Sequence, residues 1–546
     1  MVDELINFLK REGDLSFWKH IIFISIVSGI ADAGILAVIN SASATATQEG
    51  LNYRFFAIFI VLCLIFFLTK RYALKHASNK VEIIIQNSRD RISKKIINSE
   101  LVTMEGLDES SVFTRLTRDT AIISQASFRI TGAAQAIIMI FFAMIYILTI
   151  SQIAFFVIIL TSIIISATYF SFAKEFNARL VEVDGVEEGF MRSLNSVIHG
   201  FKELKINSLK RRKLLENHDS ILSELTISKI KISDLFVIAM MYADAFLYTL
   251  LALIVFIIPH LSPMESGTVI KITAAMLFLI GPFEMVISII PMVSRTGVAV
   301  KNIHELEISL DSASTKVASI KESSEPIEEF EHIKLKNTEF SYMGDDGDKL
   351  FSIGPIDLDI KQGETIFIIG GNGSGKSTLV KMLLGLYTPS KGEIMVDDEI
   401  IDNYNYQAYR DLFSIILGDF YLFDRFYGLE NIDRKLVNKL LVEMELNDKT
   451  KFIDGKFTNI NLSTGQKKRL ALILSILEDK QIYVFDEWAA DQDPEFRRYF
   501  YHTILKKLKD DGKTIIAVTH DDAYFDVADR VYKIDYGQMS QYKGKI

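Results

Sequence analysis

The residues with the most explicit chemistry lie in a glycine-rich segment. Its residues are Gly370, Gly371, Asn372, Gly373, Ser374, Gly375, Lys376, Ser377 and Thr378. A β-branched run at 366–369 precedes the segment and an apolar helical pattern follows it, which is the strand–loop–helix context of a phosphate-binding loop. The glycines let backbone N–H groups close around phosphates at a helix N-terminus. We expect Lys376 to pair with the β- and γ-phosphates of a nucleotide and the Ser377 hydroxyl to bind Mg²⁺.

Three further polar residues follow predicted strands and could complete a phosphate-cleaving site. The apolar run 481–485 ends in Asp486 and Glu487, and the run 515–518 is followed by His520. We expect Asp486 to reach the Mg²⁺ shell and Glu487 to act as general base on the attacking water. His520 is placed to sense the γ-phosphate.

A second anion site is predicted at the start of a later helix. The residues at that helix start are Ser463, Thr464, Gly465 and Gln466. Two lysines, an arginine and an apolar helical run follow them. Backbone N–H groups of Ser and Gly at a helix N-terminus attract anions.

The elements that position these residues form an α/β domain. Hydrophobicity falls after about Val300, and residues 309–329 read as a helix end and a polar linker. Beyond the linker, short β-branched runs alternate with amphipathic helical stretches. We therefore predict a nucleotide-binding domain over residues 330–546.

Apolar runs long enough to cross about 30 Å of hydrocarbon dominate the first 295 residues. We predict six spans, at residues 18–40, 55–74, 130–150, 152–172, 235–258 and 269–292. The long charged segments after spans two and four carry most of the Lys and Arg residues. The positive-inside rule therefore places these segments and both termini in the cytoplasm. Residues 1–308 are predicted to form a transmembrane domain with two long intracellular loops, which turn near 107–115 and 200–206.

Composition agrees with a chain that occupies two solvents. Of the 546 residues, 49% are hydrophobic and 24% are charged, and the mean hydropathy is +0.24. The single cysteine, Cys63, excludes an intramolecular disulfide. A net charge of −9 argues against nucleic acid as a partner.

In these motifs and in their order the sequence resembles ATP-binding cassette (ABC) transporters over nearly its whole length. The resemblance implies an exporter-type fold, in which a six-span helical membrane domain precedes an α/β P-loop domain. It also implies ATP and Mg²⁺ as cofactors, with the phosphate loop binding ATP. Tyr342 matches the aromatic residue that stacks on adenine, Asp493 the D-loop aspartate and His520 the switch histidine. Residues 463–466 match the signature motif, with Thr464 in place of its first glycine.

Three stretches, 462–469, 486–494 and 520–522, are more specific. They resemble the bacterial cyclic-peptide exporters, which include syringomycin-type lipopeptide exporters and exporters of pyoverdine precursor peptides. This resemblance implies an ATP-driven homodimer with composite ATP sites in the bacterial inner membrane. Its cargo would be a cyclic, modified or siderophore-like peptide, with or without a periplasmic or outer-membrane partner. The chain begins about 16 residues before the first span, so we expect no fused peptidase domain for leader cleavage.

Two other interpretations stay open at this point. One is a lipid or drug exporter, such as a flippase. The other is a membrane-anchored ATPase that acts as a sensor or immunity partner without net transport. The presence of both Glu487 and His520 favours a protein that hydrolyses ATP repeatedly over one that only senses a ligand. The sequence does not identify the cargo or the transport stoichiometry.

One position departs from the ABC pattern. The glutamine of the Q-loop should stand directly before Asp419, where the sequence has Gly418. The change is either a tolerated variant or one in which Asp419, or a hydrated metal ion alone, replaces the missing side chain.

The apolar spans also contain ionisable residues, which are costly at membrane depth and usually face protein or water. They are Asp32 in span one, Asp244 in span five and Glu284 in span six, where Glu284 follows a Gly-Pro pair. Tyr242 and Tyr248 flank Asp244. We expect Asp32, Tyr242, Asp244 and Glu284 to contact cargo in a polar, acidic cavity between two protomers. The alternative is that the acids lie near span ends and have no role in cargo binding.

Overall fold

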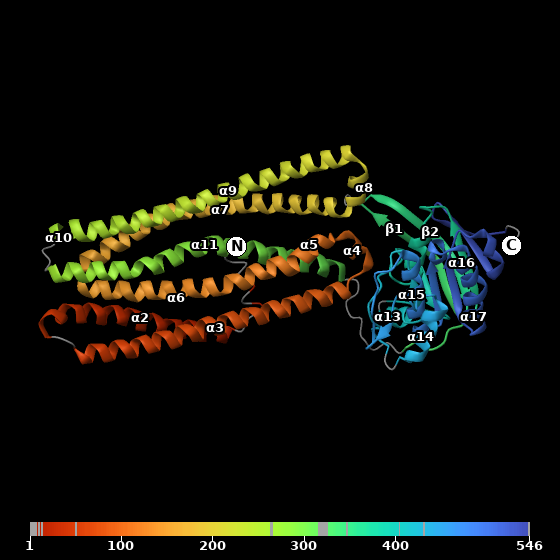
Figure 1. Ribbon diagram of the computed structural model, residues 1–546, viewed down its shortest axis with the longest axis horizontal. Coiled ribbons are helices and arrows are strands. Elements are labelled where there is room, and N and C mark those ends of the chain that lie inside the picture. Colours follow the sequence, from red (N-terminus) through yellow and green to blue (C-terminus); the bar gives the residue numbers. More distant parts are fainter. Residues whose placement is uncertain are drawn as a thin grey trace. The chain divides into compact units, whose positions relative to one another are not determined.

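The computed structural model describes residues 8, 11, 15–49, 52–261, 266–314, 326–344, 348–402, 404–429 and 432–543. They form two compact units (Figure 1). The first contains the chain up to Ile97 together with Leu107–Leu310, and the second contains Asn98–Gly106 and Asp311–Ile546. A short segment from the predicted membrane half therefore belongs to the second unit.

Long helices make up the first unit. They are α2 (Leu15–Glu49), α3 (Tyr53–Ile97), α5 (Glu109–Thr114), the π-helix η1 (Arg115–Asp119), α6 (Thr120–Ile150), α7 (Gln152–His199), α8 (Phe201–Ile206), α9 (Ser208–Ala252), the π-helix η2 (Leu253–Ile257), α10 (Ile258–Leu261) and α11 (Ser266–Ser314). Polar side chains cap three of them: Asp108 accepts a hydrogen bond from the Ser110 N–H at α5, Ser151 accepts one from the Ala154 N–H at α7, and Asn207 accepts one from the Lys210 N–H at α9. The second predicted turn, near 200–206, corresponds to α8. The first turn between long helices includes α4 (Leu101–Gly106) and α5. It therefore begins earlier in the sequence than the turn that we predicted near 107–115.

Among the described residues, five helical stretches are long and apolar enough to cross a membrane. They are Ser16–Ser43, Tyr53–Ile97, Glu109–Ile150, Ser208–His260 and Gly267–Asp311. These contain five of the six predicted spans. The remaining span, 152–172, begins in the shorter apolar stretch Gln152–Ile164 of α7, and the side chains of 165–173 lie outside the described part of the chain.

Packing within the helical unit pairs helices that are neighbours in sequence. α2 lies along α3, and α7 lies along α9 (Figure 1). Apolar residues of α2, α6, α7, α9 and α11 form one core cluster, and α7 and α9 share a second. Outside the apolar spans, the buried Glu307 carboxylate of α11 accepts hydrogen bonds from Arg11 at 2.6 Å and Arg91 at 2.7 Å.

The second unit is built around a six-stranded sheet. Its strands, in spatial order, are β12 (Gln538–Gln541), β11 (Arg530–Asp535), β3 (Thr365–Gly370), β10 (Thr514–Val518), β9 (Ile482–Asp486) and β6 (Phe413–Ile416). All neighbours pair in parallel except β12 with β11. Strands β3, β10 and β9 are apolar and almost fully buried, as expected for a parallel sheet covered on both faces.

Two smaller sheets and several helices complete this unit. An antiparallel sheet has the order β2 (Lys349–Lys361), β1 (His332–Met343), β4 (Lys391–Val396) and β5 (Glu399–Ile400), and β7 (Phe452–Ile453) pairs with β8 (Lys456–Phe457). The helices are α4, α12 (Lys376–Leu383), α13 (Tyr406–Arg410), α14 (Arg434–Glu443), α15 (Thr464–Glu478), η3 (Trp488–Asp491), α16 (Pro494–Tyr499), the π-helix η4 (Phe500–Ile504), α17 (Leu505–Asp510) and η5 (Asp522–Val527). The order of a helical unit followed by an α/β nucleotide-binding unit confirms the predicted fold class. Of the predicted linker, α11 covers the first residues up to Ser314, and 315–325 lie outside the described residues.

Candidate functional site

Sheet topology brings the predicted phosphate-handling residues to one edge. Strands β3, β10, β9 and β6 are neighbours and run parallel, so the segments after their carboxyl ends lie side by side. Those segments hold the phosphate loop, His520, the Asp486–Glu487 pair and Gly418, respectively. Residues from four separate motifs therefore meet because one sheet orders them.

The phosphate loop closes around a cavity of about 420 Å³. The lining residues are Tyr342, Phe351, Asn372, Gly373, Gly375, Lys376, Ser377, Thr378 and Glu487. Gly373 and Gly375 have φ values of 75° and 108°, a region that residues with a side chain rarely adopt. The Lys376 side chain is 6% exposed, and its ammonium group donates to the carbonyls of Gly370 and Gly371 at 3.1 and 3.0 Å. Lys376 is thus held by the loop itself and points at the space where phosphates would bind.

The Glu487 carboxylate stands between two groups that can carry a proton or a positive charge. Its Oε1 lies 3.2 Å from His520 Nε2 and 3.8 Å from Lys376 Nζ. Its backbone is fixed as well, because the N–H of Glu487 donates to Val518 O at 3.0 Å and its carbonyl accepts from Lys468 Nζ at 2.7 Å. This geometry is suited to a general base aimed at a phosphate pocket.

Asp486 has the properties of a metal ligand. It is 6% exposed, and its Oδ1 has no hydrogen-bond partner within the described part of the chain. Burial, together with the neighbouring Glu487 carboxylate, raises the pKa of Asp486, and hydrogen bonds from the Gly418 N–H and the Ser377 hydroxyl partly offset this. A buried carboxylate oxygen without a partner, next to a hydroxyl, matches the oxygen ligands that Mg²⁺ prefers. The residues present therefore fit the metal ion that the motif requires.

Gly418 presents only backbone to this site. A Cβ built on Gly418 would meet one atom within 4 Å, Asp486 Oδ2 at 3.8 Å. This is an ordinary contact, so the fold leaves room for a side chain there. Asp419, the next residue, is exposed.

Tyr342 lies at the rim of the cavity and belongs to a network that the sequence did not reveal. Its hydroxyl donates to Tyr387 Oη at 3.0 Å, and Tyr387 donates in turn to the Glu105 carboxylate of α4 at 2.5 Å. Glu105 also pairs with Lys381 at 2.7 Å. Because 276 residues separate Glu105 from Lys381, no local pattern could identify this contact. Phe351, which also lines the cavity, was likewise missed.

The signature residues start α15 but do not line the phosphate cavity of the same chain. Ser463 caps the helix: its hydroxyl accepts from the Gln466 N–H, and the Gln466 side chain accepts from the Ser463 N–H at 3.2 Å. Ser463 and Thr464 are exposed, whereas a Cβ on Gly465 would lie 2.5 Å from Asp491 O. Gly465 is therefore required by close backbone packing, and its neighbours remain open to solvent.

Asp493 also acts as a helix cap, at the start of α16. Its side chain accepts from the Phe496 N–H at 2.9 Å and pairs with Arg469 at 2.6 Å. The Phe496 N–H first, and Arg469 second, hold the pKa of Asp493 below its usual value. Arg469 further binds Gln492 at 2.9 Å and Glu445 at 2.6 Å, so this arginine ties the signature helix to the segment after Glu487.

The four predicted cargo contacts lie on three helices of the helical unit. Asp32 lines a cavity of about 310 Å³ together with Lys70 and Gln135. This cavity also includes Gly281 and Pro282, the pair expected to kink span six, but Asp244 and Glu284 are not among its lining residues. Tyr242 and Asp244 lie on α9, where Tyr242 is 62% exposed and Asp244 half-buried, and Glu284 on α11 is exposed.

Comparison with known proteins extends these observations to the whole chain. Residues 353–490 match the protein family described as ABC transporter. Over 526 residues, which cover 94% of this chain and 92% of the relative, the sequence is 30% identical to the ATP-binding protein SyrD of Pseudomonas syringae pv. syringae. A 219-residue stretch, 38% of this chain and 37% of the relative, is 27% identical to the ATP-dependent lipid A-core flippase of Chromohalobacter salexigens.

A solved structure shows the same fold. The structure of a bacterial Atm1-family ABC exporter with ATP bound matches with a TM-score of 0.79 over 96% of this chain and 95% of that chain, at 15% identity. Similarity to SyrD along almost the full length of both proteins, together with the phosphate-binding site, decides the family. The chain belongs to the ABC transporter family and is a membrane exporter whose ATPase domain drives transport.

Proposed function

We propose that the chain exports a cyclic, modified or siderophore-like peptide across the bacterial inner membrane, as a homodimer that binds ATP and Mg²⁺. Residues 1–308 would form the transmembrane domain, 309–329 the linker and 330–546 the nucleotide-binding domain, with the N-terminus and the latter domain in the cytoplasm. The observation that carries the ATP-driven step is Glu487 Oε1, held 3.2 Å from His520 and 3.8 Å from Lys376. The peptide cargo is supported by the resemblance of 462–469, 486–494 and 520–522 to cyclic-peptide exporters.

Hydrolysis follows from the positions of these side chains. Lys376 and the N–H groups of the phosphate loop stabilise the charge that the transferred phosphoryl group carries. Glu487 orients and deprotonates the attacking water, while His520 fixes the Glu487 carboxylate and contacts the γ-phosphate. Ser377 and Asp486 would hold Mg²⁺, which neutralises charge on the β- and γ-phosphates when bound. Tyr342 stacks on the adenine ring.

A second copy of the chain is needed to enclose the nucleotide. Ser463 and Thr464 are exposed and lie outside the phosphate cavity of their own chain. In a symmetric dimer, Ser463, Thr464, Gly465 and Gln466 of one protomer would cover the phosphates on the other, with Asp493 at the contact between them. ATP then favours the closed dimer through its higher affinity for that state, and hydrolysis removes this preference.

Cargo would be handled by the helical unit. We retain Asp32, Tyr242, Asp244 and Glu284 as candidate contacts with polar groups of the peptide. Lys70 lines the same cavity as Asp32, so this cavity offers both an anion and a cation. A peptide can satisfy both, because it carries amines and carboxylates as well as amides.

Lipid export is the second candidate. It is favoured by the similarity to the ATP-dependent lipid A-core flippase, although that match covers 38% of this chain. The near full-length similarity is to the ATP-binding protein SyrD rather than to the flippase, and residues 462–469, 486–494 and 520–522 resemble cyclic-peptide exporters, so we place peptide export first.

Transport into inside-out vesicles tests the proposed function. Vesicles that contain the chain should accumulate a candidate cyclic lipopeptide when Mg²⁺ and ATP are supplied. Glu487→Gln should bind ATP but hydrolyse it at least about 10²-fold more slowly, because the positioned base is lost, and uptake should cease. Glu495→Gln is the matched control, since Glu495 is an exposed carboxylate in α16, and it should behave as wild type. Flipping of a labelled lipid without peptide uptake would favour the second candidate, and near-normal ATPase activity in Glu487→Gln would exclude the role of this residue.

A further inference from the structure

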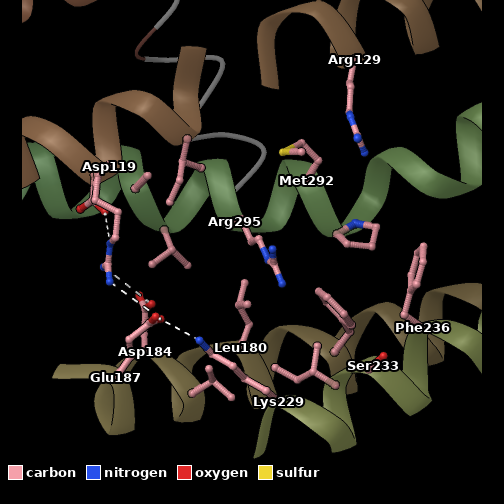
Figure 2. Close-up of a pocket in the computed structure, with 18 of the residues that line it drawn as sticks. Asp119, Arg129, Leu180, Asp184, Glu187, Lys229, Ser233, Phe236, Met292 and Arg295 are labelled. Atoms are coloured by element: carbon pink, nitrogen blue, oxygen red, sulfur yellow. Dashed lines mark hydrogen bonds and ion pairs between the residues drawn. The ribbon is translucent and has the colours of Figure 1, made fainter. Parts of the chain in front are cut away.

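A larger cavity lies entirely within the helical unit, among η1, α6, α7, α9 and α11. Its volume is about 570 Å³, and Figure 2 shows the side chains that line it. Three lining residues show where the cavity lies along the predicted spans: Arg129 directly precedes span three, Phe236 is the second residue of span five, and Met292 ends span six. The cavity is therefore at the ends of the spans that we assign to the cytoplasmic side. We call it the charged cavity.

Acidic and basic groups balance each other at one end of the charged cavity. The Arg118 guanidinium lies 3.9 Å from Asp184 and 3.8 Å from Glu187, and Lys229 Nζ lies 3.1 Å from Glu187. These ion pairs join η1, α7 and α9 (Figure 2). Asp119 is 1% exposed and accepts hydrogen bonds from Asn302 at 2.9 Å and Arg118 at 3.3 Å. Every carboxylate that lines the cavity thus already has a cationic or amide partner.

Two further cations that line the cavity have no anion beside them in the described part of the chain. Arg129 of α6 and Arg295 of α11 line the cavity, and Figure 2 shows both guanidinium groups projecting into it. Among the described residues neither side chain has a hydrogen bond or an ion pair. A guanidinium group stays protonated at any physiological pH and presents a planar set of donors that fits a carboxylate. The part of the cavity that these two side chains line therefore has the charge to bind an anion.

Apolar side chains line much of the rest of the cavity. They are Phe176, Leu180, Val183, Ile232, Phe236 and Met292. A ligand that fits must combine an anionic end with an apolar body, and it can reach polar groups at the ion-paired end. A cavity of about 570 Å³ is in the range that holds a drug-sized molecule or a short peptide. A phospholipid shares the charge pattern, but its two long acyl chains would exceed this volume.

We propose that the charged cavity binds the cargo peptide through a free carboxylate, which Arg129 and Arg295 hold while apolar side chains of the peptide lie against Phe236 and Met292. This inference rests on the proposed function and names its substrate class: peptides with an apolar body and at least one free carboxylate. It adds a cationic contact to the acidic and aromatic contacts inferred from the sequence.

The direct test is probe binding to the full-length chain in phosphatidylcholine nanodiscs without nucleotide. The probe is dansyl-Leu-Phe-Leu with a free carboxylate, compared with the same peptide as its C-terminal amide. Fluorescence anisotropy should give a Kd for the acid at least about tenfold lower than for the amide, because a charge-assisted hydrogen bond is worth about one decade or more in affinity. Arg129→Gln/Arg295→Gln should remove this preference.

The matched control is Arg192→Gln. Arg192 is an exposed arginine of α7 that pairs with Glu188 at 3.8 Å and does not line the charged cavity, so its replacement should leave the preference for the acid intact. A charge-reversed variant distinguishes a lost binding preference from misfolding of the chain. Arg129→Glu/Arg295→Glu should prefer dansyl-Leu-Phe-Leu with a cationic aminoethylamide end over the acid, which a merely unfolded chain cannot do.

Equal affinity of the wild-type chain for acid and amide, or a preference that survives in Arg129→Gln/Arg295→Gln, overturns the inference. A fluorescent phosphatidylglycerol that binds in an arginine-dependent manner, while the acid peptide does not, assigns the cavity to a lipid headgroup and likewise overturns it. Uptake of the peptide into vesicles distinguishes failure of this inference from failure of the proposed function. Uptake that persists without any effect of the arginines rejects this inference alone, whereas arginine-dependent binding without uptake rejects the proposed function.

Discussion

At Gly418 the protein lacks the side chain that the ABC pattern leads us to expect, and the structure shows what remains. The backbone N–H of Gly418 bonds to Asp486, and the nearest atom to a Cβ added at this position would be Asp486 Oδ2, at 3.8 Å. The site thus keeps one backbone contact to the Asp486 carboxylate, our candidate metal ligand, while leaving space beside it. Glu487, Lys376 and His520 form their contacts without help from this position.

We predict that Gly418→Gln leaves ATPase activity within a few-fold of wild type. The new side chain meets no clash at its Cβ, and the proton-transfer residues stay in place. Asp419→Ala, measured in the same steady-state ATPase assay over a range of Mg²⁺ concentrations, distinguishes the alternatives. A large rise in the Mg²⁺ requirement of Asp419→Ala would show that Asp419 has replaced the missing glutamine, and unchanged activity in both variants would leave the hydrated metal ion as the explanation.

At the scale of elements, the short helix η3 fixes the backbone that carries Glu487. Its first residue, Trp488, is 1% exposed, stacks on Phe500 at 4.2 Å between ring centroids, and donates from Nε1 to Lys468 O at 2.9 Å. Lys468 itself donates to the Glu487 carbonyl at 2.7 Å. The large side chain therefore ties α15 to the segment that carries Glu487.

Replacing Trp488 tests this role. We predict that Trp488→Ala destabilises the nucleotide-binding unit by about 3–5 kcal/mol, because it leaves a cavity in the core, and that ATP turnover falls with it. Trp488→Phe should cost much less, since the ring contact with Phe500 is kept and mainly the indole hydrogen bond is lost, a net loss of about 1 kcal/mol. Differential scanning calorimetry of the purified chain measures both. Trp18→Phe, in the helical unit, is the control; an unchanged transition in Trp488→Ala would contradict the assignment.

At the scale of the whole molecule, the ATP site is divided between surfaces that one chain does not bring together. The phosphate loop, Asp486, Glu487 and His520 meet at the sheet edge, but Ser463 and Thr464 do not line their cavity. The exposed signature segment can serve an ATP site only by contacting another chain. In the dimer that we propose, catalysis would therefore depend on closure of the two nucleotide-binding units.

Mixed dimers provide the test. Lys376→Ala should abolish phosphate binding in one chain, and Ser463→Arg should block the signature surface in another; each homodimer should be inactive. Co-expression should restore a substantial part of the wild-type ATPase activity, because each mixed dimer keeps one site with both Lys376 and Ser463 intact. The double mutant Lys376→Ala/Ser463→Arg mixed with wild type is the control for dilution. Failure of the two single mutants to complement would show that each site lies within one chain.

The sequence alone determined the parts of the protein that depend on short stretches of chain. A phosphate loop is a local motif whose glycines and lysine act within nine residues, and an apolar run long enough to span a bilayer needs no partner to be recognised. The sequence also pointed to Asp486, Glu487 and His520, because each lies at the end of an apolar strand or within two residues of it, and parallel strands end at a common edge. The capping of α15 by Ser463 and Gln466 is local for the same reason.

Only the tertiary structure decided the contacts between distant segments. Glu105 meets Tyr387 and Lys381 across more than 270 positions, and the charged cavity combines Arg129 with Arg295 on helices that the sequence could not place side by side. The three membrane carboxylates looked equivalent as residues, yet Asp32 alone of the three lines the cavity that also contains Lys70. The physical reason is that periodicity and hydropathy report the solvent around one element, whereas the pairing of charges depends on which faces of separate helices pack together.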